Sequence, residues 1–303
     1  MIAATGALPP TGDRQMFSTT ILGQVFLNGL SLSAIYVLIA LGFTLLFGIM
    51  KVVNFAHGAF AMLGGYALYY LYGVAGLPYL AAILLSALAV ATGGMVLEVL
   101  VFRWFYQKMF QSMIGLLGLN IAIVFTCVIV FDVYERSIPP VMDGVIEFGD
   151  LIIPTDRLLV VAIAASALGA FWAFMSLSRW GLAMRAAAQD VEIAETQGIR
   201  TGRVYKLAFF AATFMAALAG GIYAQIYALS PFMGDRPLMV AFVVVILGGM
   251  GSIPGAALGG VIFGFAESFL STFYGSAVSS FASFGVVIAL LIVRPWGLLG
   301  TPE

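Results

Sequence analysis

Long apolar runs separated by short charged segments make up most of the chain. Three runs are bounded closely enough to predict one membrane-spanning helix each, and they extend from Lys108 to Asp132, from Arg157 to Arg179 and from Lys206 to Asp235. A spanning helix needs about 20 apolar residues. A charge at its centre costs roughly 2.5 to 3.5 kcal/mol, so charges mark the ends of spans. The pattern therefore predicts an all-α protein that crosses a membrane several times.

The remaining apolar runs are longer and need division. The run from Arg14 to Lys51 predicts one helix, and the run from Lys51 to Glu98 predicts two, divided near residues 73–78 by glycine and proline. The last run, from Pro237 to Val293, fits two long helices or three shorter ones. At about 20 residues for each helix, the expected total is eight or nine spans.

Basic residues set the expected orientation, because they accumulate in cytoplasmic loops. The loop at about residues 177–206 holds five of them, so we place it inside: Arg179, Arg185, Arg200, Arg203 and Lys206. Alternation then places Lys51, Arg103 and Lys108 inside and Arg14, Arg136, Arg157 and Arg236 outside. On the outer side, Asp143-Gly144 predicts a β-hairpin turn within the segment Tyr134 to Arg157. That segment could be a lid, a docking surface or a solvated connector.

The inner loop has its own helical pattern. Alanine and other helix formers run from Ala183 to Gln197, and Gly198 is a typical C-terminal stop. The helix carries charges of both signs and has a modest apolar face. It could be gripped by another protein, or it could lie at the lipid headgroups.

Composition narrows the possible functions. Hydrophobic residues make up 62% and charged residues 9% of the 303 residues, and mean hydropathy is +1.09, which excludes a soluble protein. Cys127 and His57 are the single cysteine and histidine, so we expect no metal site. No Gly-Lys pair occurs, hence no phosphate-binding P-loop, and the net charge of −1 gives no reason to expect nucleic-acid binding. We therefore expect neither an enzyme nor a cofactor bound by this chain.

Five polar residues within or beside the apolar runs could line a translocation pathway. Asn54 could instead cap a helix, and His57, in the first turn of that helix, could bond to backbone at the membrane interface. Helix–helix hydrogen bonds are the alternative for Asn28 and Asn120. Glu267 is the strongest candidate, since a carboxylate in this setting must face water or a partner. The small-residue spacing of Gly251, Gly255 and Gly259, and of Gly260 and Gly264, predicts close helix packing.

Three sequence blocks carry a resemblance to a known family. They are GFTLLFGIMKVVNFAHG from Gly42 to Gly58, MRAAAQDVEIAETQGIRTGRVYKLAF in the inner loop, and LGGMGSIPGAALGGVIFGFAES from Leu247 to Ser268. Together they resemble the permease subunits of bacterial ABC importers for branched-chain amino acids, of the shorter type. The importer pattern Glu-Ala-Ala, three residues, Gly matches at Glu192, Ala194 and Gly198, with Ile193 departing from alanine.

The resemblance implies a single transmembrane permease domain over residues 1–303, whose loop at 177–206 is the coupling segment. It implies docking on an ATPase through Asp190, Glu192, Ala194, Gly198, Arg200 and Arg203. The implied partners are a second homologous permease, two cytoplasmic ATPase subunits that bind the ATP, a soluble substrate-binding protein and membrane lipid. The expected location is the bacterial inner membrane. The alternative is a stand-alone, ion-coupled secondary transporter, and an intramembrane enzyme is a more distant third.

Overall fold

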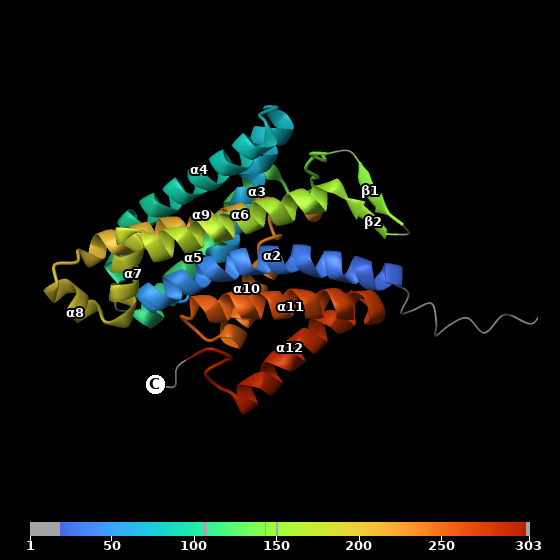
Figure 1. Cartoon of the computed structure of the whole chain (residues 1–303). Coiled ribbons are helices and arrows are strands. Elements are labelled where there is room, and N and C mark those ends of the chain that lie inside the picture. The colour runs from blue at the N-terminus through green and yellow to red at the C-terminus, as the bar shows by residue number, and fades with distance from the viewer. Residues whose placement is uncertain (1–18, 106–107, 143, 150, 301–303) are drawn as a thin grey trace, which may run out of the picture.

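The computed structural model describes residues 19–105, 108–142, 144–149 and 151–300, and most of them are helical (Figure 1). Arg14 and Asp143, used above for the topology and the hairpin turn, lie outside these residues. Six described helices are long and apolar enough to cross a membrane: α2 (Thr19–Met50), α4 (Tyr79–Leu100), α5 (Met109–Phe131), α6 (Thr155–Leu177), α9 (Thr201–Ile226) and α11 (Ile253–Tyr274). The three clearly bounded apolar runs correspond to α5, α6 and α9. A multi-pass membrane protein is therefore confirmed.

The expected count of eight or nine spans is not confirmed. Helix α3 (His57–Leu68) has 12 residues before a short π-helix, η1 (Tyr69–Val74), and α10 (Asp235–Gly248) has 14. At 1.5 Å per residue, α10 covers only about 21 Å of a core roughly 30 Å thick, and α3 covers about 18 Å before η1 continues it. A further apolar helix, α12 (Ser276–Val293), follows α11. The last apolar run thus contains three helices of unequal length.

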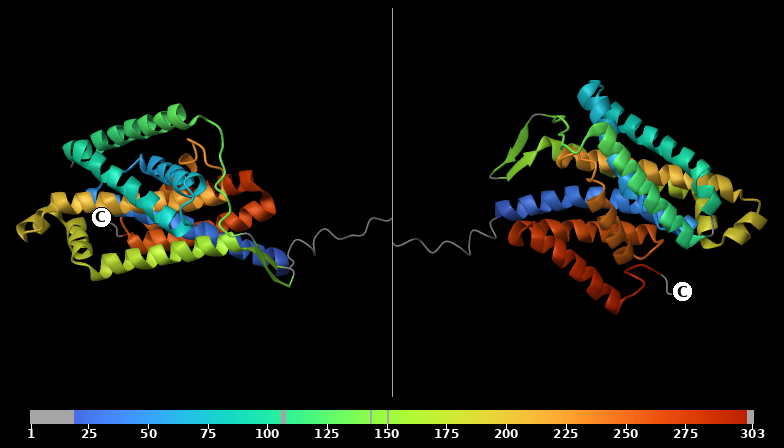
Figure 2. Two further views of the ribbon diagram at one scale, coloured as in Figure 1. Left: turned by 90° about the horizontal axis from the view of Figure 1, so that it is seen from above. Right: turned by 180° about the vertical axis from the view of Figure 1, so that it is seen from behind.

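Helices α2 and α9 form the centre of the molecule. In their most apolar windows 83% and 78% of the residues are buried, compared with 17% in α5 and 28% in α6. Helices α4 and α5 lie on one side of this centre and α12 on the other (Figure 2). The exposed apolar side chains of α5, such as Ile129 at 84% exposure, are suited to lipid or a partner subunit.

Glycines allow the central helices to approach closely, as their spacing predicts. A Cβ atom on Gly260 or Gly264 would overlap Val37 or Ser33 of α2. On the opposite face of α11, a Cβ on Gly255 would overlap the backbone of Gly248 in α10. Helix α11 is therefore fixed between α2 and α10.

Each end of the bundle carries a distinct feature. At one, the hairpin end, β1 (Val145–Phe148) pairs antiparallel with β2 (Leu151–Pro154), and Gln24 Nε2 donates to the Ile152 carbonyl at 2.7 Å. At the other, the α8 end, lie α7 (Arg179–Gln189) and α8 (Val191–Thr196), together with η2 (Phe102–Phe105). The hairpin expected between Tyr134 and Arg157 is therefore present in a mostly helical fold, but its register places the turn after Phe148 rather than at Gly144. The strands flank Gly149 because prolines before Gly144 cannot donate to a strand ladder.

Candidate functional site

The inner loop folds into two helices rather than one. The prediction of a continuous helix from Ala183 to Gln197 is wrong, because the backbone becomes extended at Asp190 (φ −156°, ψ 119°). The Asp190 carboxylate accepts a hydrogen bond from the Ile193 N–H at 2.9 Å, which satisfies a free donor at the start of α8. A short helix with its own cap thus projects beyond the ends of the long helices (Figure 1).

The predicted docking residues are divided between the surface and the interior of this tip. Asp190, Glu192 and Gly198 are exposed, and Gly198 ends the segment with φ +81°, a left-handed conformation that favours glycine. Ala194 is only 3% exposed and packs inward. The apolar side chain that the tip presents is Ile193, at 61% exposure. It is the position where the sequence departs from the importer pattern, and its role was not predicted from the sequence.

Arg200 and Arg203 lie beside the tip, where α9 begins. Both are exposed, and together with Arg179 and Trp180 they line a hollow of about 420 Å³ between α7 and the start of α9. The part of the chain that the structure describes pairs none of these three guanidinium groups with a carboxylate. They remain available to an anionic partner.

Glu267 lies in a charged cluster inside the membrane-spanning region. Its carboxylate pairs with Arg236 of α10, and Tyr36 of α2 donates its hydroxyl to Oε2 at 2.7 Å. The Glu267 side chain is 7% exposed and the Arg236 side chain 46%. Arg236, which we expected on the outer side, is the second residue of α10, and its guanidinium neutralises a carboxylate that the bundle buries.

The cluster lies well within the depth of the bundle. At 1.5 Å per residue, Glu267 is about 21 Å along α11 from Ile253 and about 10 Å from Tyr274. Helix α10 runs antiparallel to α11, since Gly248 meets Gly255 at the α8 end and Arg236 meets Glu267 at the other. The amino end of α10 thus begins inside the spanning region rather than at its surface. Half-helices that begin inside the membrane mark binding sites in several transporters.

Asn54 and His57 are placed in a second buried region. The Asn54 side chain accepts the Ala56 N–H at 3.0 Å, but the residue that precedes α3 is Ala56, so Asn54 orders the turn and is not the formal N-cap. The His57 Nε2 lies 3.0 Å from the Ile39 carbonyl of α2, and the residue is fully buried. The backbone bond to His57 is confirmed, whereas its interfacial position is not.

The five pathway candidates do not converge on one site. Asn28 is half-buried near the start of α2, and its Oδ1 has no partner among the described residues. Asn120 is half-buried on α5, a helix with a largely exposed surface. No hydrogen bond within the described ranges joins Asn28, Asn120 or the Asn54–His57 pair to Glu267. Only Glu267 belongs to a charged cluster.

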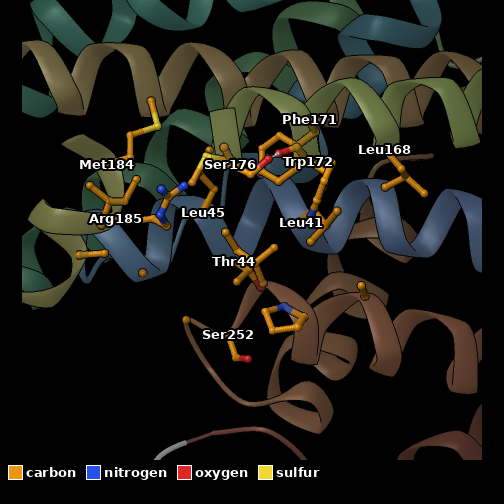
Figure 3. Close-up of a pocket in the computed structure, with 18 of the residues that line it drawn as sticks. Leu41, Thr44, Leu45, Leu168, Phe171, Trp172, Ser176, Met184, Arg185 and Ser252 are labelled. Carbon is orange, nitrogen blue, oxygen red and sulfur yellow. Dashed lines mark hydrogen bonds between the residues drawn. The ribbon is translucent and has the colours of Figure 1, made fainter. Parts of the chain in front are cut away.

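A cavity that the sequence did not predict connects the inner loop to the bundle. It measures about 690 Å³ and lies between α2, α6, α7 and the start of α11. Its walls are mainly apolar, with Arg185 reaching toward α2 at one end and Leu168 at the other (Figure 3). Helix α7 therefore borders an open space, although Met184 and Ala187 on the same helix are buried in the core. No sequence motif indicates such a space, since residues far apart in the chain form it.

Comparison with known proteins gives a consistent result. The family profile described as "Branched-chain amino acid transport system / permease component" matches residues 25–293. The chain is 31% identical to the high-affinity branched-chain amino acid transport system permease protein BraD of Pseudomonas aeruginosa, over 92% of this chain and 96% of that protein. It is 33% identical to the corresponding protein LivH of Escherichia coli K12, over 93% and 96%. Among solved structures, PsaBC from Streptococcus pneumoniae in complex with Fab aligns with a TM-score of 0.49 and 12% identity, over 89% of this chain and 92% of that chain.

Proposed function

Because the chain belongs to the family of permease components of branched-chain amino acid transport systems, we propose that it is the permease subunit of an ATP-driven importer in a bacterial inner membrane. Its cargo is a branched-chain or related amino acid. A second homologous permease completes the pathway, two cytoplasmic ATPase subunits bind and hydrolyse ATP, and a soluble binding protein delivers the substrate. This chain contributes no catalytic site of its own.

The capped α8 tip is the observation that carries this proposal. It projects from the bundle, it is bounded by the Asp190 cap and by Gly198 at φ +81°, and it exposes Glu192 and Ile193. A docking helix must stay helical when a partner binds it. A helix this short is not stable in isolation, so it needs the Asp190 cap and the Gly198 end. Glu192 and Ile193 would enter the ATPase surface, with Arg200 and Arg203 pairing carboxylates at the rim. Ala194 would support the tip from inside.

Movement of the ATPase pair would reach the membrane through α7. This helix follows the Ser178 cap, whose hydroxyl oxygen accepts the Gly181 N–H at 2.9 Å, and it faces the cavity of about 690 Å³. On the side of this open space, α7 can move without first separating interlocked side chains. The cavity also borders Gly251 and Pro254 at the start of α11. A displacement of α7 could therefore bias α11, which holds Glu267.

The alternative, an ion-coupled transporter that acts alone, is less well supported by the geometry. Such proteins often place ionisable groups that bind and release the coupling ion at depth. Glu267 is instead held by an arginine and a tyrosine hydroxyl. The carboxylate in the cluster thus already has its counter-ion.

Purification from native membranes in mild detergent separates these two functions. We expect ATPase subunits and a second permease to accompany the tagged chain, and we expect Glu192→Arg to release the ATPases while the second permease stays. Glu147→Arg, an exposed charge reversal on the hairpin, is the matched control and should retain all partners. Recovery of the chain alone, active in transport without ATP after reconstitution, would refute the importer and favour the secondary transporter.

A further inference from the structure

A second cavity lies against the charged cluster. It measures about 300 Å³, at the low end of the range for small-molecule sites, and it is lined by residues of α10, α11 and α12. Its lining falls into a charged part, formed by Asp235, Arg236 and Glu267, and an apolar part. The apolar part includes Met239, Val243, Phe263 and Phe284.

The charged part has unused binding capacity. The only recorded side-chain hydrogen bond of Arg236 within the described ranges goes to Glu267, although a guanidinium offers five N–H donors. The Asp235 carboxylate, exposed at the first residue of α10, forms no ion pair with the described residues. An exposed charge of each sign therefore faces the cavity. The amino end of α10 adds partial positive charge at the same place.

From this arrangement we propose that the cavity is a binding station for the zwitterionic head of an α-amino acid with an apolar side chain. The proposal rests on the function proposed above and names where this chain contacts the cargo. Arg236 binds the carboxylate, Asp235 binds the ammonium group, and the apolar wall receives the side chain. Glu267 and Tyr36 are positioning residues, because they orient the Arg236 guanidinium.

A purely structural ion pair does not explain the depth and composition of the charged cluster. A structural pair needs one carboxylate for one arginine, but here a second carboxylate is present. Asp235 is exposed next to Arg236, at the level of Glu267, which the helix rise places about two-thirds of the way along α11 from the α8 end. Charges at this depth must face water or a partner. Because the cluster is nearer to the hairpin end, the station would receive cargo from the side where a binding protein delivers it.

A cysteine-protection experiment on the complete importer in liposomes tests the station directly. The variant Ser280→Cys, made with Cys127→Ser, places a thiol in the cavity lining, and its labelling rate by a small water-soluble thiol reagent is measured. Leucine at tens of millimolar should slow labelling several-fold. 4-Methylpentanoate, which lacks the ammonium group, and 3-methylbutylamine, which lacks the carboxylate, should slow it much less. Ser276→Cys, one turn earlier on α12 and outside the lining, is the matched control and should be unaffected.

Three variants connect protection to the charges. Asp235→Asn and Arg236→Gln should each remove the leucine protection, while Arg236→Lys should retain part of it. Protection by 4-methylpentanoate equal to that by leucine would show an apolar pocket and overturn the proposal. So would labelling of Ser280→Cys that leucine does not change while the unmodified importer transports leucine with ATP. Failure of the importer function itself would appear separately, as absence of ATP-driven uptake and of co-purifying ATPases.

Discussion

A double-substitution cycle on Arg236 and Glu267 measures the charged cluster most directly. Glu267→Gln removes the ion pair but leaves an amide oxygen that can accept from Tyr36. Because the Arg236 side chain is 46% exposed, we expect a loss of about 1 kcal/mol in the free energy of unfolding. Arg236→Gln leaves a carboxylate that is only 7% exposed without its counter-ion, and breaking a buried pair in this way costs about 3 kcal/mol.

The double variant should be less damaged than the sum of the single variants. Two amides can hydrogen-bond to each other and no charge is left unpaired, so we expect a total loss of about 2 kcal/mol and hence a coupling energy of about 2 kcal/mol. The free energy of unfolding is measured on the purified permease by denaturing-detergent titration in mixed micelles. Losses that add to within about 0.5 kcal/mol would show that the two side chains are independent. The pairing, and the positioning role of Glu267, would then be wrong.

Three further substitutions test other parts of the structure. Gly198→Arg places a bulky residue at φ +81°, which costs roughly 1 to 2 kcal/mol of backbone strain, and it should abolish uptake at unchanged membrane abundance. Gly198→Asn should retain most of the uptake activity. Normal uptake by the arginine variant would remove the docking assignment. Asp190→Ala loses the hydrogen bond from the Ile193 N–H, which costs about 1 kcal/mol of helix stability, and it should speed amide hydrogen exchange in α8. Asp190→Asn, which keeps a capping oxygen, is the control. Equal exchange rates in the two variants would contradict the cap. Gly220→Val would overlap the Ala61 backbone and should prevent a monodisperse preparation of the permease. Gly169→Val, with open space around its Cβ, should be tolerated. Equal behaviour of the two variants would refute the close packing at Gly220.

The sequence predicts the spans well wherever one apolar run holds one helix. Helix α5 lies within its run, whereas α6 and α9 begin two and five residues before the charge that starts theirs. The length and apolar character of each run are enough to predict such a helix. The glycine spacing around Gly260 also predicted close packing correctly, since a small residue on every turn leaves a groove for a neighbour. The stop at Gly198 follows from local backbone preference.

The sequence could not predict features that depend on contacts distant in the chain. Arg236 has the pattern of a loop residue, and its partner Glu267 is 31 positions away. Helix α10 is short because Asp235 begins it inside the bundle. The break at Asp190 lies in a run of good helix formers, where a side-chain cap outweighs propensity. The expected pathway residues were chosen one by one for polarity, which gives no information about whether they meet.

The two candidate sites are connected by a single element. Helix α11 begins at Ile253, which lines the large cavity beside α7, and it carries Glu267 about 21 Å further along. Its glycines fix it against α2 on one face and α10 on the other, so it moves with those helices as a packed unit rather than bending between them. An ATP-driven displacement of α7 would then alter the position of Glu267, and with it the Arg236 guanidinium that we assign to the cargo carboxylate. Under the proposed importer function, such a permease would need no titrating relay of its own, because α11 would couple the docking tip to the binding station.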